Sequence, residues 1–151
     1  MELSDLPSIT ASHLAKSIDL NHHETLFAGR MAEWVVEAGF MTARAVLDCS
    51  PDQLVCACLD RLEFSRSVPK GSTVVVVGRA AHVGRSSVTI YIEASLLGPN
   101  DQHDRVTGGF ATFVHIDEHG ARAHGLVVEV PGDPSQRARW DAILEQRRRT
   151  S

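Results

Sequence analysis

A side-chain amide, two small residues and a carboxylate lie close together between residues 21 and 37, at a spacing that suits hydrolysis. Asn21 precedes Ala28 and Gly29, where we expect a long apolar-striped helix to begin. Glu37 follows about two turns into that helix. The first N–H groups of a helix have no partner within it and lie at its positive dipole end, so they can hold a developing oxyanion. Together these residues could polarise a carbonyl, position a water molecule and accept its proton.

Each of these residues also has a purely structural interpretation. Asn21 has the side chain of a turn residue that caps the entrance of a helix. Glu37 could be a buried acid that pairs with an arginine. His22 and His23 could act as bases near neutral pH or could simply be surface residues of the loop. Glu33, one helical turn before Glu37, is interpreted as a solvated or salt-bridging residue.

The helix that would position these groups is predicted over residues 28–46, because apolar side chains recur there at three- and four-residue spacing. Its predicted buried face consists of Met31, Trp34, Val35, Ala38, Met41, Thr42 and Ala45. Gly39 lies inside this helix, and a glycine is tolerable there if the helix must pack closely against a sheet.

The second half of the chain predicts strands, because it is rich in β-branched and alternating residues. The ranges are 53–62, 72–83, 87–94 and 106–116, and a charged C-terminal helix follows over 135–149. In the last strand, one side is expected to carry Val106, Gly108, Phe110, Thr112, Val114 and Ile116. Residues 1–20 are expected to form a leader segment in which residues 12–18 pair with or cover the sheet.

This order of elements predicts an α+β fold in which one antiparallel sheet wraps around one long central helix. A lone helix cannot cover both faces of such a sheet, so the sheet should curl around it. The outer face and the edges of the sheet would then favour dimerisation. No repeat, low-complexity tract or linker is present, so a single domain over residues 1–151 is expected.

The composition excludes several other classes of function. The net charge of −4 gives no reason to expect binding to nucleic acid or to a membrane. The basic run 147–149 is expected to be a solvated helix terminus. No apolar stretch is long enough to span a bilayer, and the N-terminus lacks the features of a signal peptide. The three cysteines lack metal-ligand spacing with histidine and are expected to be reduced thiols in a cytoplasmic protein.

Five segments between residues 20 and 117 form an ordered pattern. They are Asn21 with Ala28-Gly29; the run 33–39, which contains Trp34 and Glu37; Asp60-Arg61-Leu62-Glu63-Phe64 with Val68-Pro69-Lys70-Gly71; Arg79 with Val83-Gly84-Arg85-Ser86-Ser87-Val88; and Ala111-Thr112-Phe113-Val114-His115-Ile116-Asp117. No single segment is specific. In this order and at these separations, however, the pattern resembles the hotdog-fold acyl-CoA thioesterases, the acyl-CoA hydrolase branch in particular.

The resemblance implies a hotdog fold and the hydrolysis of acyl-CoA to a free carboxylic acid and coenzyme A. It implies no metal and no cofactor, since coenzyme A is part of the substrate. Sites of this family form at the interface of a two-hotdog unit, often within a hexamer, so self-association as a dimer or a trimer of dimers is expected. Carried over to this chain, Asn21 would orient the attacking water or the thioester. A backbone N–H of Ala28 or Gly29 would bind the thioester oxygen. His23 stands where related sequences often carry a histidine.

The chain departs from the family pattern at Val36. Many relatives have an acid at that position, seven residues after the second glycine, and Glu37 matches a second acid that often follows. One residue is a rotation of about 100° around a helix, so Glu37 need not point where the first acid would point. Some relatives have only the later acid, which keeps Glu37 as the candidate catalytic carboxylate.

Four residues are candidates for binding the phosphates of coenzyme A. Arg85 and Ser86 lie in a predicted turn between strands, while Arg66 and Lys70 lie near the preceding turn. Arginine suits this role because its guanidinium offers two parallel donors to a phosphate. Each of the basic residues can also be interpreted as ordinary surface charge.

Several alternatives remain beside the hydrolase hypothesis. A non-catalytic acyl-CoA-binding or regulatory hotdog protein is one of them, and Val36 motivates it. A dehydratase acting on hydroxyacyl thioesters is disfavoured, because the Asp-x4-His spacing of such enzymes is absent before the helix. Direct attack by water and a transient anhydride are both compatible with the hydrolase hypothesis. Neither a Gly-x-Ser-x-Gly elbow nor a Gly-x4-Gly-Lys-Ser/Thr phosphate loop occurs.

Overall fold

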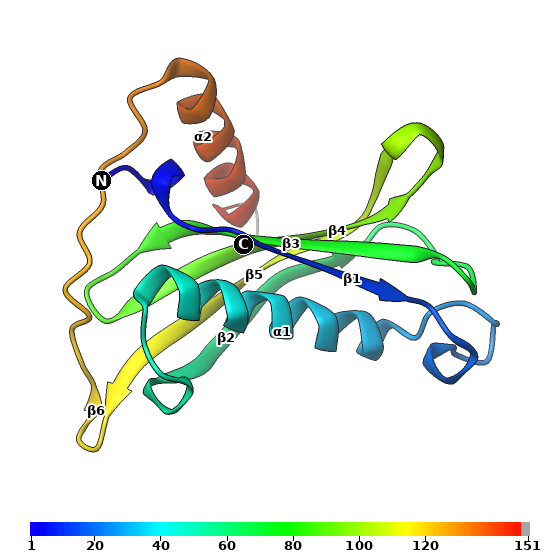
Figure 1. Ribbon diagram of the computed structural model, residues 1–151, viewed down its shortest axis with the longest axis horizontal. Coiled ribbons are helices and arrows are strands. Elements are labelled where there is room, and N and C mark those ends of the chain that lie inside the picture. The colour runs from blue at the N-terminus through cyan, green and yellow to red at the C-terminus, as the bar shows by residue number, and fades with distance from the viewer. Residues whose placement is uncertain (149–151) are drawn as a thin grey trace.

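The computed structural model describes residues 1–148, which form one antiparallel sheet and two helices (Figure 1). In chain order the elements are β1 (Ile9–Leu14), α1 (Ala28–Leu47), β2 (Leu54–Phe64), β3 (Thr73–Val83), β4 (Ser87–Leu97), β5 (His103–Asp117), β6 (Gly120–Ala121) and α2 (Pro134–Arg148). The helix and strands predicted from the sequence are therefore confirmed. Arg149, predicted to end the C-terminal helix, lies outside the described residues.

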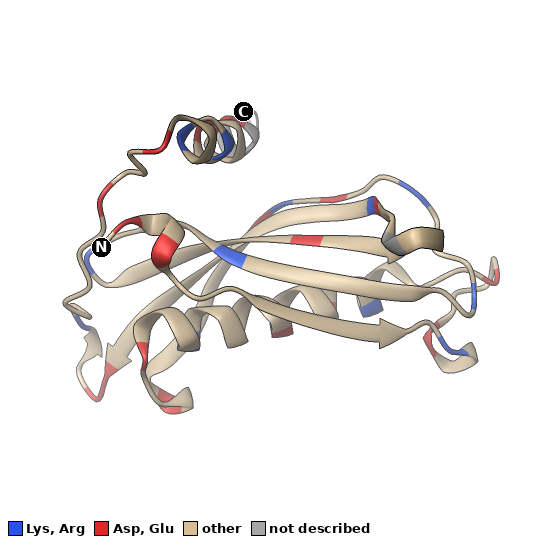
Figure 2. Cartoon of the chain, turned by 45° about the horizontal axis from the view of Figure 1, so that its top comes forward, with Lys and Arg blue, Asp and Glu red and all other residues tan. Residues whose placement is uncertain are grey.

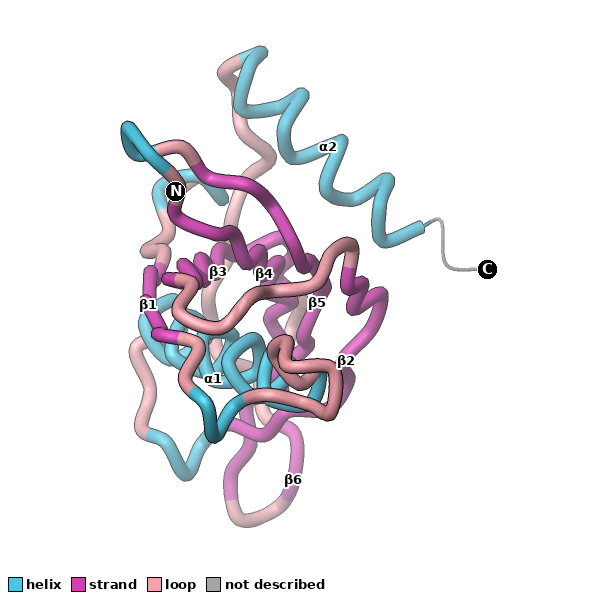
Figure 3. The backbone as a smooth tube through the Cα atoms, turned by 90° about the vertical axis from the view of Figure 1, so that its right-hand side faces the viewer, coloured by secondary structure: helices cyan, strands magenta, loops and turns pink. Residues whose placement is uncertain are grey.

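The sheet has the strand order β1-β3-β4-β5-β2, and the short β6 pairs with the end of β5. Viewed along the strands, it curves around α1, with β1 and β2 at the two edges (Figure 3). The other face carries α2, so the two helices lie on opposite sides of the sheet (Figure 2). Within the predicted leader segment, β1 pairs with β3 from Ile9 to Leu14, which places this segment at an edge of the sheet.

The main core lies between α1 and the inner face of the sheet. Its helical side chains follow the predicted spacing, and the residues buried on α1 are Met31, Trp34, Val35, Ala38, Gly39, Thr42, Ala43 and Val46. Met41, predicted to be buried, is 42% exposed. The buried face of α1 is thus narrower at Met41 than the sequence predicted.

The helix approaches the sheet closely where two glycines lie at the contact. A Cβ atom at Gly39 would lie 3.1 Å from the ring of Phe113, and one at Gly78 of β3 would lie 2.3 Å from Oγ1 of Thr42. The Thr42 hydroxyl donates a 2.7 Å hydrogen bond to the carbonyl oxygen of Ala38 and is completely buried. The contact between α1 and β3 therefore has no room for an additional methyl group.

Gly78→Ala is expected to lower the free energy of unfolding by about 1–3 kcal/mol, because overpacking forces buried atoms apart. Adding Thr42→Ala removes the atom that the new methyl group meets, so the double variant should regain part of the loss. Urea denaturation of the two single variants and the double variant measures the coupling. Strictly additive losses would contradict this account of the contact.

A bulge in β5 changes which side chains face the helix. Ala94 pairs with Thr107 and Ser95 with Arg105, so Val106 is an extra residue in β5. Val106 belongs to the core on the helix side, whereas Phe110 belongs to the outer cluster under α2. The prediction that Val106 shares one side of the strand with the residues from 108 to 116 is therefore wrong. The bulge interrupts the alternation at Val106, while Thr107 keeps the register of Ala111 and Phe113, which also face the helix.

The edge strand β2 exposes apolar side chains to solvent. Val55 is 44% exposed, Leu59 38% and Phe64 47%. Its inner edge pairs with β5, while its outer edge has no neighbouring strand among the described residues. Such an edge is a template for pairing with another chain.

Neither described helix combines the length and the apolar character that a membrane span requires.

Candidate active site

The loop that leads into α1 is closed at its base by backbone pairing. Leu20 and Leu26 form an antiparallel bridge, and the N–H of Asn21 donates to the carbonyl of Thr25 at 2.8 Å. Glu24 takes a positive φ of 62° at the tip, and its N–H donates to the carbonyl of Asn21 at 3.1 Å. This compact turn fixes where the Asn21 side chain begins.

The amide oxygen of Asn21 organises the loop. It accepts hydrogen bonds from the N–H of His23 at 2.8 Å and from both the N–H and the hydroxyl of Thr25 at 3.3 Å. Asn21 is therefore a turn residue, as its structural interpretation predicted, but its bonds do not cap the helix, because His23 and Thr25 lie before α1. These bonds use only the amide oxygen, so they orient the amide nitrogen without occupying it.

The first turn of α1 begins beside this loop. The N–H groups of Arg30 and Met31 donate to the carbonyl of Phe27, while Phe27 at the N-cap makes no side-chain capping bond. Ala28 and Gly29 come before the first residue whose N–H can reach a carbonyl of the helix. A Cβ at Gly29 would lie 2.4 Å from the ring of Phe27, so a glycine lets that ring lie against the first turn.

A cavity of about 310 Å3 joins the loop to the helix N-terminus. It is lined by Asn21, Thr25, Leu26, Ala28, Met31, Phe64, Ser65, Arg66, Ser67, Val68 and Thr107. Of the residues predicted from the sequence, it therefore brings together Asn21, Ala28 and Arg66. Thr107 and Phe64 were missed, because pairing between β2 and β5 brings both to the loop from distant parts of the chain. The cavity can take a carbonyl group that is approached by backbone and amide donors.

Glu37 does not line this cavity. It is exposed on α1, nine residues after Ala28, which is about 13 Å further along the helix axis. Val36 is partly buried beside it. Glu33, one turn earlier, pairs with Arg30 at 2.9 Å, as its salt-bridging interpretation predicted. Within one chain, the candidate acid and the candidate amide therefore face different regions of space.

The two loop histidines lie outside the lining of the cavity. His22 and His23 are both exposed, and their ring centroids lie 3.9 Å apart. His23 contributes its backbone N–H to the bond with the Asn21 side chain. Its observed part in the site is to hold Asn21, and a role for its ring remains a prediction.

The four candidate phosphate-binding residues fall into two groups. Arg66 lines the cavity, and Lys70 is exposed next to Pro69, which forms a bridge with Thr25 of the loop. Arg85 and Ser86 lie in the turn between β3 and β4. The carbonyl of Ser86 accepts a bond from the N–H of His115, near the end of β5 furthest from Thr107. In one chain, the two groups therefore lie at opposite ends of the sheet.

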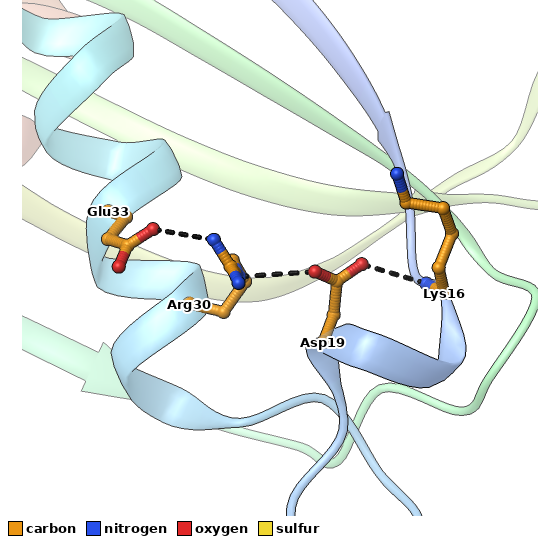
Figure 4. Close-up of polar contacts among 4 residues, drawn as sticks. All are labelled: Lys16, Asp19, Arg30 and Glu33. Carbon is orange, nitrogen blue, oxygen red and sulfur yellow. Dashed lines mark hydrogen bonds and ion pairs between the residues drawn. The ribbon is translucent and has the colours of Figure 1, made fainter.

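A buried carboxylate holds the N-terminus of α1 in place (Figure 4). Asp19 is 5% exposed; its two oxygens contact Nε of Arg30 at 3.1 Å and the N–H of Lys16 at 2.9 Å. Its backbone carbonyl accepts the N–H of Phe27 at 2.8 Å. Asp19 thus ties the segment before the loop to the first turn of the helix after it.

Asp19→Ala is expected to lower the free energy of unfolding by about 1–3 kcal/mol. The loss of a buried partner is costly, although the remaining arginine is partly solvated. Glu33→Gln, which removes the exposed partner of the same Arg30, should cost less than about 1 kcal/mol. Urea denaturation of both variants tests this order, and equal losses would show that Asp19 is not the anchor.

No group of three or more histidine, cysteine, aspartate or glutamate side chains suited to a metal ion occurs among the described residues.

The fold is similar to those of solved thioesterases over most of the chain. The acyl-CoA hydrolase of Staphylococcus aureus, solved with butyryl coenzyme A, coenzyme A and coenzyme A disulfide, matches with a TM-score of 0.83. The identity is 23%, and the match covers 99% of this chain and 88% of that chain. An apo-hexameric acyl-CoA thioesterase matches with a TM-score of 0.79 at 21% identity, covering 98% and 92% of the two chains. A hexameric thioesterase from Yersinia pestis matches with a TM-score of 0.66 at 24% identity, covering 82% and 94%.

No curated protein sequence matches the chain. The sequence profile described as the thioesterase superfamily, however, matches residues 23–100, just over half of the 151 residues. This range begins in the loop of Asn21 and continues through α1, β2, β3 and β4. With the hotdog arrangement of the sheet around α1, it shows that the chain belongs to the thioesterase superfamily.

Proposed function

We propose that this protein is an acyl-CoA thioesterase that hydrolyses acyl-CoA to a free carboxylic acid and coenzyme A. The observation that carries the proposal is the cavity that contains both the Asn21 amide and the first turn of α1. A thioester carbonyl oxygen there would accept the N–H of Ala28 or Gly29. These donors would stabilise the oxygen as it becomes negatively charged. Water adds to the carbonyl carbon, the C–S bond breaks, and the thiolate of coenzyme A takes up a proton.

The carboxylate of this site is proposed to come from a second copy of the chain. Glu37 is exposed and lies far from the cavity of its own chain, so it can serve only a cavity on another copy. The exposed apolar edge of β2 offers a surface on which two copies can meet. The dimer is the expected unit, and a trimer of dimers is consistent with the hexamers formed by similar proteins. The substrate phosphates would then be held by Arg66 and Lys70 of one copy and by Arg85 and Ser86 of the other.

The spacing of the candidate residues supports Glu37 as a displaced acid. Two alanine variants of the Staphylococcus aureus enzyme replace an asparagine and an aspartate that lie 15 residues apart (43 − 28). The same step from Asn21 leads to Val36, and Glu37 is the next residue. If the carboxylate of Glu37 is the base, it approaches the attacking water less directly than an acid at position 36 would. Val36→Asp should therefore be at least as active as the natural chain.

A panel of acyl-CoA substrates with a thiol-detecting reagent tests the proposal. Thiol release above that of the heat-inactivated protein is expected, and the panel also reports the preferred acyl chain length. The three cysteines of the chain are themselves free, so the reagent must be titrated against the protein alone. Absence of release with every substrate would exclude the hydrolase.

The second candidate function is a non-catalytic acyl-CoA-binding module, favoured by Val36 at the position of the helical acid. In that case acyl-CoA should raise the Tm by mass action while no thiol is released. The three free cysteines suit the reducing cytoplasm, which is the location proposed with either function.

A further inference from the structure

A second cavity, of about 200 Å3, lies on the opposite face of the sheet from α1. It is bounded by α2, by β3 and by the N-terminal segment that precedes β1, and Figure 2 shows α2 standing above this part of the sheet. Its lining combines apolar walls with two arginines, Arg79 and Arg139. The thioesterase proposal makes no use of this cavity.

One face of α2 is fixed over the cavity. Gln136, Arg139, Trp140 and Ile143 all line it, and they follow the three- and four-residue spacing of a single helical face. The indole Nε1 of Trp140 donates a 2.8 Å hydrogen bond to the carbonyl of Ala81, and Ile143 is buried against the sheet. Arg139 therefore lies on the side of α2 that packs toward the sheet, above Arg79.

The guanidinium group of Arg79 is partly buried, and it is repelled by the like charge of the exposed Arg139. Burial, and after it the charge of Arg139, lowers the pKa of Arg79. Among residues whose side chains the structure describes, neither arginine has a carboxylate within the 4.0 Å of an ion pair. Arg30, Arg105 and Arg137, by contrast, each have one.

The carboxylates near this cavity form their hydrogen bonds with groups other than Arg79 and Arg139. The carboxylate of Glu93 accepts hydrogen bonds from Arg105 at 3.2 Å and from the Tyr91 hydroxyl at 2.7 Å. Its charge raises the pKa of Arg79, but it forms no ion pair with that arginine. At the N-terminal segment, Glu2 accepts the N–H of Gly132 at 3.0 Å and Asp5 accepts the N–H of Glu2 at 2.9 Å. The charged side chains that line the cavity are therefore those of Arg79 and Arg139, and both are positive.

We propose that this second cavity binds a phosphate group between Arg79 and Arg139. Guanidinium groups match phosphate with paired N–H donors, and a shared anion removes the repulsion between them. The hydroxyl of Ser8 and the amide of Gln136, which also line the cavity, can complete the coordination of the oxygens. The indole of Trp140 provides an apolar wall for an organic group that carries the phosphate.

Thermal unfolding in a phosphate titration at constant ionic strength tests the proposal. The Tm of the natural protein should rise by about 4–8 °C once phosphate exceeds its Kd about 30-fold, and chloride should not reproduce the rise. Arg79→Gln and Arg139→Gln should each abolish it. Arg137→Gln is the matched control, because it removes the same charge from the same helix outside the cavity and should retain the rise.

The sign of the effect without phosphate separates binding from a structural role. In phosphate-free buffer of low ionic strength, Arg139→Gln should unfold at a higher Tm than the natural protein, because it relieves the repulsion. With phosphate the order of the two Tm values should reverse.

A repeat of the titration with adenosine 3′,5′-bisphosphate separates two sources of the phosphate group. A rise with this compound alone that Arg79→Gln abolishes assigns the cavity to a nucleotide phosphate, and a rise with inorganic phosphate that Arg79→Gln abolishes assigns it to the free anion; a rise that Arg79→Gln retains comes from another site and would overturn the proposal. An equal response of all variants to every salt would overturn the proposal, and because no step uses thioester turnover, the result is independent of the proposed activity.

Discussion

Asn21→Asp is expected to lower kcat/KM for acyl-CoA by about 10²–10³-fold, the scale of losing one donor to a developing oxyanion. Aspartate keeps the oxygen that accepts the bonds of His23 and Thr25, so the loop should keep its fold. It replaces the NH2 group by a second oxygen, which cannot donate and carries negative charge toward the reacting carbonyl. Steady-state kinetics together with the Tm of the same sample measure both effects.

Two further variants make this result specific. Asn21→Ala should lose the activity and also lower the Tm, because it removes the acceptor that closes the loop. Glu24→Gln, in the exposed tip of the same loop, replaces a carboxylate by an amide, the reverse of Asn21→Asp. It should keep kcat/KM within about two-fold. Full activity of Asn21→Asp would remove the amide nitrogen from the site.

Glu37→Gln is expected to reduce kcat by about 10²–10⁴-fold, the usual contribution of a general base or nucleophilic carboxylate. The assignment to a cavity of another copy makes a stronger prediction. Glu37→Gln and Asn21→Ala, each inactive alone, should restore activity when they are co-expressed. With random pairing in equal amounts, about a quarter of the sites receive both natural residues, so about a quarter of the natural activity should return.

Glu33→Gln is the matched control for Glu37, because it lies one turn earlier on the same exposed side of α1 and pairs with Arg30. It should keep kcat within about two-fold. An inactive mixture of the two variants would show that Asn21 and Glu37 do not share a site across copies. Full activity of Glu37→Gln alone would exclude its carboxylate from the chemistry.

The sequence was sufficient to predict the architecture, because periodicity is a local property. The apolar residues of α1 recur at helical spacing, and the β-branched runs of β3 and β4 alternate as strands do. Gly39 lies against Phe113, as its place in a closely packed helix predicted. These features need only neighbouring residues for their interpretation.

The site was harder to predict because it depends on pairing between distant segments. Alternation along β5 is enough to place Thr107 on the helix side, but only its pairing with Ala94 and Phe64 places it beside the loop of Asn21. Phe64 comes from the end of another strand. Asn21 was found because its loop is adjacent to the helix in the sequence. Asp19, which anchors that helix, had no signal beyond being an acid before a turn.

Phe64 connects two features that have been described separately. Its ring is 47% exposed at the end of the edge strand β2, and it is also a wall of the cavity beside Asn21. A chain that docks along this edge therefore also closes off the cavity from bulk water. Dilution below the dissociation constant of the assembly should then reduce the turnover of each chain, so that the rate per molecule rises with protein concentration before it reaches a plateau.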